Sequence, residues 1–314
     1  MPRMTPSLRA HHFAGLKPGP RLIVLGAVHG NEVAGTRGIE RVLTELDRGR
    51  WRIERGALTL VPVANPLAYA RGTRMGERNL NRRLLPSAAP QVYEDHLANR
   101  LCPWLAAHDV LLDLHSFRTP GEPFVMRGPA DNLGRLEPFA HAGAEGRLAE
   151  HLGPTRIVDG WMSVYAHGVA QRRRHRAADS ADIRYGIGTT EYMRSQGGYG
   201  VTLECGQHDD ARAPQVAYRA IRQAVALLGM ADLPLAPPPA RFERLTLRTV
   251  VDREHEDDHF VRAWTSFDAV KAGQRIALRR DGTPVLAPAA GRIVFPDAQA
   301  APGDEWFYFA THAG

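Results

Sequence analysis

The chain has only two cysteines, Cys102 and Cys205, among 314 residues. Two cysteines are too few for the disulfide framework of a small secreted protein. No stretch of about 20 apolar residues is present, so no membrane-spanning helix is expected. Residues 1–20 lack the apolar run of a signal peptide, and the expected location is therefore the cytoplasm.

Lysine is almost absent as well. Of the 40 basic residues only Lys17 and Lys271 are lysine, and the formal net charge is +6. Because the arginine fork pairs bidentately with phosphate and carboxylate, this composition favours an anionic partner, either a small molecule or nucleic acid. With 44% hydrophobic and 24% charged residues, the chain is otherwise typical of a globular protein large enough to fold without disulfides or metal. Any metal site is therefore expected to serve function.

Short apolar runs alternate with helical patterns over the first two-thirds of the chain. The predicted strands cover residues 22–25, 58–63, 110–114 and 201–204, and the clearest helices cover 39–46 and 216–228. This alternation predicts an α/β fold with a mainly parallel, doubly wound sheet. The proline-rich segment 233–239 predicts a stiff linker between a catalytic domain, residues 1–232, and a smaller C-terminal all-β domain, residues 240–314.

His29 and Glu32 follow the first predicted strand, and His115 ends another strand of the same sheet. Because loops beyond the carboxyl ends of neighbouring parallel strands converge in one crevice, the three side chains are expected to meet. Two histidines and a glutamate with one open position are the ligand set of a catalytic zinc site. Taken alone, the His-x-x-Glu spacing also fits a surface histidine and a glutamate favoured by the dipole at a helix start.

Five short blocks occur in one order along the chain. They are His29-Gly-Asn-Glu32, Val63-Ala-Asn65-Pro66, Arg74 with Asn79-Leu-Asn81-Arg82, Asp113-Leu-His115-Ser116, and Thr202-Leu-Glu204-Cys-Gly206. Together they resemble the succinylglutamate desuccinylase/aspartoacylase family, a branch of the zinc carboxypeptidase superfamily. The resemblance spans about residues 20–230 and implies a catalytic domain with a zinc carboxypeptidase-like fold.

The resemblance also implies the catalytic metal site. One Zn²⁺ per chain would be bound by His29, Glu32 and His115, and Glu204 would be the general base. Zinc lowers the pKa of a bound water and polarises a carbonyl, while a nearby carboxylate takes the proton of the water. The position of Glu204 agrees with this role, because a carboxylate at the end of an apolar strand is costly unless it faces a polar cleft.

Four further residues match the substrate-binding pattern of the family. Arg74 would stabilise the developing oxyanion, and Asn81 with Arg82 would hold a substrate carboxylate. Arg194 lies ten residues before the predicted base, where the aspartate-deacylating members carry another carboxylate-binding arginine. We therefore expect an anionic small-molecule substrate with at least one carboxylate and, through Arg194, with two.

These residues predict a zinc-dependent hydrolase, a deacylase that cleaves the amide bond of an N-acyl amino acid or a related carboxylate-bearing amide. A metallocarboxypeptidase acting on short peptides would use the same groups and stays open. In a different class, an arginine-rich nucleic-acid-binding protein also stays open. No membrane or nucleic-acid partner is expected, and a homo-oligomer is compatible with the sequence.

Three other patterns are given no catalytic role. The string His255–His259 matches HExxH but is continuously polar and lies in the β domain, so it predicts a solvated charged turn. The basic run Gln171–Arg176 lacks interleaved aromatics and predicts a solvated loop. The C-terminal region resembles a barrel-sandwich hybrid of the biotinyl/lipoyl type, but its hairpin tip Arg279–Thr283 has no lysine to carry a cofactor. Covering the active site or forming an oligomer contact is the role expected for this domain.

Overall fold

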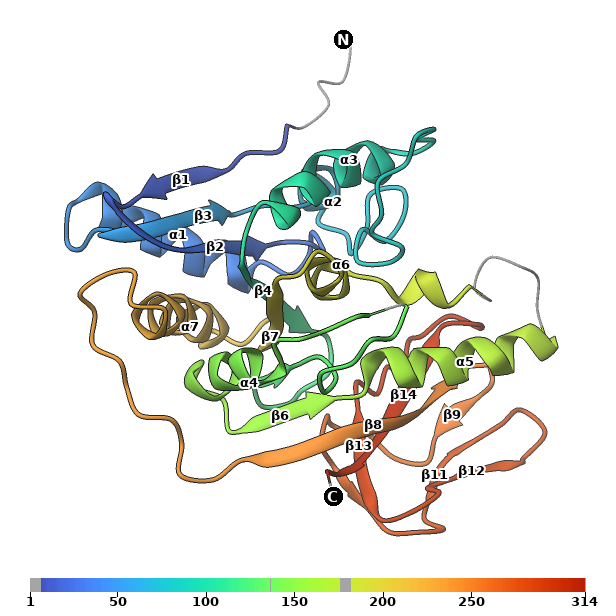
Figure 1. The fold of residues 1–314 in the computed structure, drawn as a ribbon. Helices are drawn as coiled ribbons and strands as arrows, with labels where there is room; N and C mark the ends of the chain where they lie inside the picture. The colour runs from blue at the N-terminus through green and yellow to red at the C-terminus, as the bar shows by residue number, and fades with distance from the viewer. Residues whose placement is uncertain (1–6, 136, 176–181, 314) are drawn as a thin grey trace.

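A central sheet runs through the molecule, and a smaller sheet lies at its C-terminal end (Figure 1). The structure is a computed structural model that describes residues 7–135, 137–175 and 182–313. Across the central sheet the strands are β1 (His11–Ala14), β3 (Arg55–Val61), β2 (Lys17–Gly26), β4 (Val110–Phe117), β7 (Tyr199–Gln207), β5 (Phe124–Met126), β6 (Arg156–Asp159), β8 (Glu243–Asp252), β14 (Glu305–His312), β13 (Gly291–Val294) and β10 (Ala269–Val270). The smaller sheet contains β12 (Pro284–Leu286), β11 (Arg275–Leu278) and β9 (His259–Phe260).

The strands that carry the predicted site pair in parallel, and helices cover both faces of the sheet. β2 pairs in parallel with β3 and β4, and β4 pairs in parallel with β7. One face packs against α1 (Ala34–Asp47), α4 (Ala142–His151) and α7 (Ala213–Leu227), and the other against α3 (Tyr93–Ala106) and α6 (Thr189–Ser195). The remaining helices are α2 (Pro66–Arg71), α5 (Trp161–His175) and a 3-10 helix (Ile183–Gly186). The predicted fold class is confirmed.

The second half of strand β2, Leu22–Leu25, is an unbroken apolar run because it has a core on each side. Leu22 and Val24 pack in the core with α1 and α7, whereas Ile23 and Leu25 pack in the core with α3 and α6. Successive side chains of a strand point to opposite faces, so a strand covered on both sides needs an unbroken apolar run. Burial of each of these side chains stabilises the folded state by about 1.5–3 kcal/mol.

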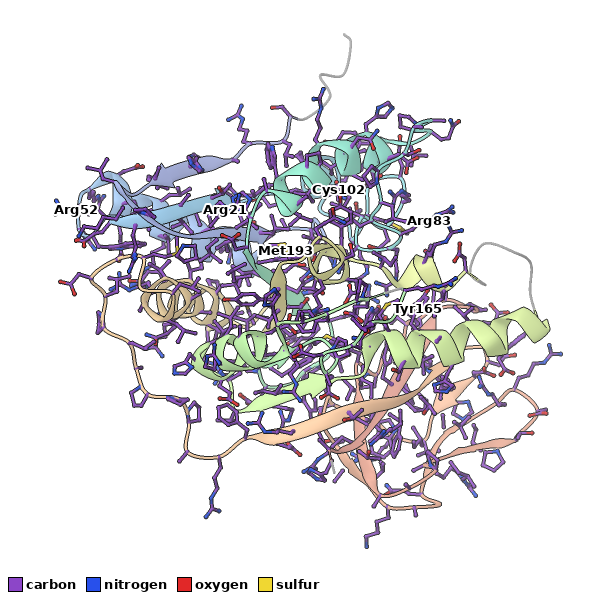
Figure 2. All side chains as sticks on the ribbon, viewed as in Figure 1. Arg21, Arg52, Arg83, Cys102, Tyr165 and Met193 are labelled. Atoms are coloured by element: carbon purple, nitrogen blue, oxygen red, sulfur yellow. The ribbon has the colours of Figure 1, made fainter. Side chains whose placement is uncertain are left out.

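The core on the α3 side also holds two sulfur-containing side chains. Cys102 on α3 and Met193 on α6 lie between these helices and the sheet, and both are fully buried (Figure 2). Because α6 directly precedes β7, this packing fixes the entry of the strand that carries Glu204.

The C-terminal strands continue the central sheet. β8 pairs in parallel with β6, and β14 pairs antiparallel with β8. Residues 233–239 form neither helix nor strand, and this part of the chain runs along the outside of the molecule between α7 and β8 (Figure 1). The domain boundaries at 232 and 240 stay predictions, and the structure adds that strands from both sides of the linker share one sheet.

Aromatic side chains pack between strand β5 of the α/β part and the C-terminal region. The ring of Phe124 on β5 lies 4.8 Å from that of Phe267 and 5.3 Å from that of Phe295, centroid to centroid. The ring of Phe295 in turn lies 6.3 Å from Tyr308 on β14. This packing places the C-terminal region against the carboxyl ends of β4 and β7, where the predicted site lies.

Two of the patterns without a catalytic role need correction. The basic run was expected to be a loop, but α5 continues through residues 171–175, and Arg176 lies outside the described residues. His255–Asp257 form the predicted turn, yet Asp258 is buried rather than solvated and accepts a hydrogen bond from Arg279 Nη1 at 2.9 Å. In the described part of the chain no helix is long and apolar enough to cross a bilayer.

Candidate metal centre and active-site pocket

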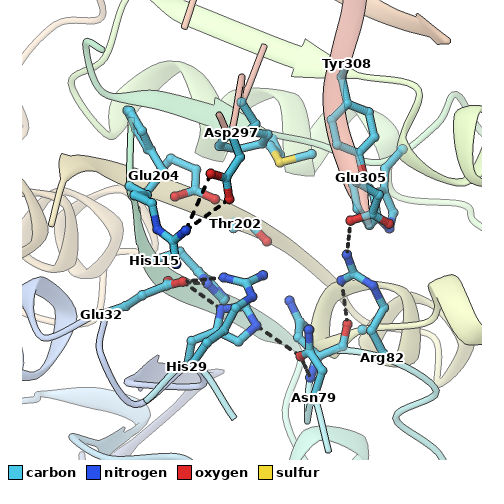
Figure 3. Close-up of a pocket in the computed structure, with 18 of the residues that line it drawn as sticks. His29, Glu32, Asn79, Arg82, His115, Thr202, Glu204, Asp297, Glu305 and Tyr308 are labelled. Atoms are coloured by element: carbon cyan, nitrogen blue, oxygen red, sulfur yellow. Dashed lines mark hydrogen bonds and ion pairs between the residues drawn. The ribbon is translucent and has the colours of Figure 1, made fainter. Parts of the chain in front are cut away.

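The three predicted metal ligands lie together at the carboxyl ends of neighbouring strands (Figure 3). His29 and Glu32 lie in the loop between β2 and α1, and His115 lies near the end of β4. Their ligand atoms all lie within 4.8 Å of one another, and the two imidazole centroids are 4.9 Å apart. All three side chains are buried, so the cluster is a built feature of the fold rather than a surface coincidence.

Both imidazole rings turn Nδ1 toward Glu32 and Nε2 toward a second oxygen. Nδ1 of His29 and Nδ1 of His115 each lie 2.8 Å from a Glu32 carboxylate oxygen. The outer nitrogens, both Nε2, are held by Asn79 Oδ1 at 3.0 Å and by Asp113 Oδ2 at 2.9 Å. An outer nitrogen that donates to an oxygen leaves Nδ1 as the electron-pair donor, which is how proteins preset histidines for metal. The donor set therefore fits a zinc ion with one open position.

Burial and neighbouring charges set the protonation of each of the three candidate ligands. Burial, reinforced by the charge of Arg74, lowers the pKa of His29 to about 4. Burial would raise the pKa of Glu32, but the neighbouring His29 and His115 hold it well below its usual value. A neutral imidazole and an ionised carboxylate are the forms that ligate metals, as His29 and Glu32 present them. Despite burial, the carboxylates of Asp113 and Glu32 hold the pKa of His115 well above its usual value, so a metal that bound this ring would displace a proton from it.

Glu204 lies on β7, beside the three candidate metal ligands. It is the residue directly opposite His115 in the pairing of β7 with β4. Its side chain lies in the pocket wall (Figure 3) and is buried. Its Oε2 atom has no hydrogen-bond partner among the described residues, and burial raises the pKa of its carboxyl group to about 8. A poorly solvated carboxylate with a free oxygen in the pocket wall is suited to proton transfer.

The loop that carries Arg74 is held in place by hydrogen bonds to the buried carboxylate of Glu94. Arg74 Nη1 donates to Glu32 Oε1 at 2.9 Å, and about half of the Arg74 side chain is exposed. The backbone N–H groups of residues 76–78 and the side-chain amide of Asn65 all donate to Glu94 of α3, at 2.9–3.3 Å. The sequence analysis did not identify Glu94. The one feature of the sequence that could have indicated it is a carboxylate at a buried position of an amphipathic helix.

Arg82 is buried and engaged by the C-terminal region. Its Nη2 donates to Glu305 Oε2 of β14 (Figure 3), at 3.2 Å. Its guanidinium lies 5.0 Å from the ring centroid of Trp161. Despite burial, the charge of Glu305 holds the pKa of Arg82 above its usual value. Asn81 Oδ1 accepts from Thr189 N at 3.0 Å, so the side chain of Asn81 fixes the start of α6.

Arg194 lines the same pocket, but its guanidinium is saturated. Its five N–H groups donate to Glu145 twice, at 2.9 and 3.2 Å, to Glu137 at 2.6 Å, to Glu191 at 3.3 Å and to the carbonyl of Gly200 at 2.9 Å. No donor remains for a second substrate carboxylate, which was the predicted role of Arg194. We therefore leave Arg194 out of the proposed binding set.

The pocket has a volume of about 560 Å³ and is walled by both parts of the chain. The C-terminal region contributes Phe295, Asp297, Glu305 and Tyr308 to the wall. Asp297 is ion-paired with Arg118, which follows β4, at 3.2 Å. The expected role of this region in covering the active site agrees with this placement.

One further polar pair in the pocket was missed by sequence reasoning. Ser116 follows His115, and its Oγ lies 2.8 Å from Nδ1 of His208, which also lines the pocket. The sequence analysis named Asn79 and Asp113 only as members of motifs, without a role. The spacing of Asp113 and His115 was a signal of their contact, because residues two apart on a strand share a face.

Comparison with known proteins gives one family match. Residues 18–120 match the model of the succinylglutamate desuccinylase/aspartoacylase catalytic domain, which confirms the resemblance seen in the sequence. No curated protein matches the chain significantly in sequence.

Solved structures resemble the whole chain. A succinylglutamate desuccinylase/aspartoacylase from Rhodobacter sphaeroides is 17% identical with a TM-score of 0.74, covering 98% of this chain and 89% of that one. The product-bound ectoine utilization protein EutE (DoeB) from Ruegeria pomeroyi is 20% identical with a TM-score of 0.71, covering 98% and 93%. A succinylglutamate desuccinylase from a Silicibacter species is 17% identical with a TM-score of 0.70, covering 98% of each chain. At these identities the likeness shows the fold, including the C-terminal region.

Proposed function

We propose that the chain carries a catalytic domain of the succinylglutamate desuccinylase/aspartoacylase family and that it is a zinc-dependent deacylase. The family match supports an amide-cleaving hydrolase. The proposed reaction is hydrolysis of the amide bond of an N-acyl amino acid or a related amide that bears a carboxylate. His29, Glu32 and His115 would hold the metal.

The observation that carries this proposal is the position of Glu204. It lies opposite His115 across the β4–β7 pairing, with a buried oxygen that no group of the described chain satisfies. Leaving a buried carboxylate oxygen without a partner costs free energy, so such a group is typical of a site where water or substrate supplies the partner. A purely structural glutamate would have been paired, as Glu94 is.

Each remaining residue of the site has a defined task in this reaction. Glu204 accepts a proton from the attacking water and passes it to the leaving amine. The part of Arg74 not engaged by Glu32 is exposed to the pocket and donates to the carbonyl oxygen as negative charge develops there. Arg82 binds the substrate carboxylate, and Asn81 fixes the loop that positions it. A zinc ion, when bound, would supply Lewis-acid polarisation of the carbonyl and lower the pKa of water.

Metal analysis and a hydrolysis assay test this proposal. The purified protein should contain about one zinc per chain, and it should release amino acid from N-acetyl amino acids in a reaction abolished by a chelator and restored by Zn²⁺. Glu204→Gln should lower turnover by roughly 10²–10⁴-fold with zinc content unchanged. Glu150→Gln removes the same charge from an ion pair outside the pocket and is the matched control. Near-normal turnover of Glu204→Gln would remove Glu204 from the mechanism.

The same assay separates the alternatives. A metallocarboxypeptidase would cleave dipeptides in preference to N-acyl amino acids, although it would also need the metal and Glu204. A nucleic-acid-binding protein would bind DNA or RNA with an affinity that falls steeply with salt and survives chelation. Salt-sensitive nucleic-acid binding without any hydrolysis would refute the proposed enzyme.

A further inference from the structure

The arginines that line the pocket are already paired with carboxylates of the protein itself. In the described residues these ion pairs are Arg74–Glu32 at 2.9 Å, Arg82–Glu305 at 3.2 Å, Arg118–Asp297 at 3.2 Å, Arg127–Asp159 at 3.0 Å and Arg194–Glu145 at 2.9 Å. An arginine that faces a carboxylate of its own chain adds little net positive potential to a pocket. The pocket wall is therefore much less attractive to anions than its arginine content indicates.

The pairing is strongest around Arg194. Three carboxylates, those of Glu137, Glu145 and Glu191, surround this one guanidinium, and together with the Gly200 carbonyl they take up all five of its N–H groups. The Arg194 side chain is only 2% exposed. Turning it toward a substrate would leave buried carboxylates without their counter-charge, which is a costly arrangement.

The cluster around Arg194 has an excess of negative charge when its three carboxylates are ionised. Burial raises the pKa of Glu137 to about 7, so this carboxylate adds its charge to the cluster above that pH. Glu191 itself lines the pocket. A carboxylate that entered this side of the pocket would lose its hydration, find no free donor on Arg194 and meet a field of the same sign.

We propose that the enzyme selects substrates with a single carboxylate and discriminates against those with two, and that Glu137, Glu145 and Glu191 exert this selection by saturating Arg194. The inference rests on the proposed function and adds the substrate class to it. Arg82 binds the single carboxylate, because in the described residues only two of its five N–H groups are engaged, by Glu305 and by the carbonyl of Asn81. Arg74 faces the carbonyl oxygen. Neither the acyl group nor the side chain of the amino acid then carries a second carboxylate.

Three N-acyl amino acids of known charge test the inference without any variant. N-acetyl-L-alanine has one carboxylate, N-acetyl-L-aspartate has a second on the amine side, and N-succinyl-L-alanine has a second on the acyl side. At pH 8 the wild-type, zinc-loaded enzyme should show kcat/KM at least tenfold higher for N-acetyl-L-alanine than for either of the others. Equal or higher kcat/KM for either substrate with two carboxylates would overturn the inference.

Glu137→Gln tests the residues that are proposed to cause the selection. This variant removes one charge of the cluster while Glu145 and Glu191 still hold Arg194. The discrimination against at least one substrate with two carboxylates should fall by roughly three- to tenfold, the effect of one unit charge a few ångströms from the pocket wall. Glu150→Gln, on the same helix as Glu145 but outside the pocket, should leave the ratio unchanged. An unchanged ratio in a Glu137→Gln protein that folds and turns over would refute the assignment to this cluster.

Failure of the inference and failure of the proposed function give different results. If none of the three substrates is cleaved by the zinc-loaded protein, the proposed function is refuted and the inference with it. If the substrates with two carboxylates are cleaved best, the proposed function stands and only the selection is wrong.

Discussion

Replacing Glu94 by glutamine is expected to loosen the active-site loop while the core stays folded. The Glu94 carboxylate is fully buried and accepts hydrogen bonds from Asn65 Nδ2 and from the backbone N–H groups of residues 76–78. The same loop carries Arg74, which donates to Glu32, and Asn79, which holds His29. The carboxylate therefore positions two contacts of the metal centre without touching the centre itself.

The size of the effect follows from the number of donors left unpaired. Glutamine keeps one oxygen and replaces the other with an amide that cannot accept. If the amide replaces Oε2, the N–H group of Arg78 loses its acceptor, whereas that of Glu77 keeps Oε1 at 3.3 Å. A buried unsatisfied donor costs about 1–3 kcal/mol, so the loop is destabilised by about 1–3 kcal/mol. Because the loop can open locally, only part of this cost should appear in global unfolding.

A loop displaced by about 1 Å is expected to lower kcat/KM by about tenfold to a hundredfold. Glu45→Gln is the matched control, because Glu45 is also a buried carboxylate, bonded to Trp51, Tyr218 and Arg222, but it joins α1 to α7 outside the pocket. Steady-state kinetics and thermal unfolding of both variants are the measurements. Glu45→Gln should lower the melting temperature and leave kcat/KM near normal. The reasoning fails if Glu94→Gln keeps near-normal kcat/KM, or if both variants lose activity in proportion to stability.

Three further predictions follow from the site. Asp113→Asn should lower zinc affinity by about 10–100-fold, because the orienting partner of His115 is changed; unchanged affinity in a competition assay would contradict this. Arg82→Ala should raise KM for every substrate and change kcat little, and an unaltered KM would exclude Arg82 from carboxylate binding. Burial raises the pKa of Glu137 in the folded protein to about 7, whereas the unfolded chain has the ordinary, lower value. The folded state therefore binds this proton more tightly, and the free energy of unfolding falls as pH rises from about 4.5 to 7. Relative to Glu137→Gln, denaturant unfolding of the wild type should lose up to about 1.4 kcal/mol per pH unit in that window, and parallel pH profiles would refute the shift.

The sequence by itself was sufficient to predict the α/β part of the fold and the three residues that cluster as a candidate metal site. The apolar run Leu22–Leu25 predicts a strand buried on both faces, and the same residues form β2 with a core on each side. His29, Glu32 and His115 could be placed together because each follows or ends a parallel strand, and the carboxyl ends of such strands share one edge of the sheet. The order of the motifs was sufficient to indicate the family.

Tertiary structure alone decided the charge of the pocket. From the sequence, Arg194 and Arg82 were expected to be free to bind a substrate. In the structure Arg194 is hydrogen-bonded to Glu145, 49 residues away, and Arg82 to Glu305, 223 residues away. Local sequence patterns report the period of an element and the face it buries, whereas the partner of a charge depends on how distant segments are packed. β8 joins the central sheet through β6 for the same reason, and it brings Glu305 on the neighbouring strand β14 to the pocket. The linear sequence therefore identified the groups that are proposed to perform the chemistry, and only the packing of the whole chain showed which of their donors are already engaged by the protein itself.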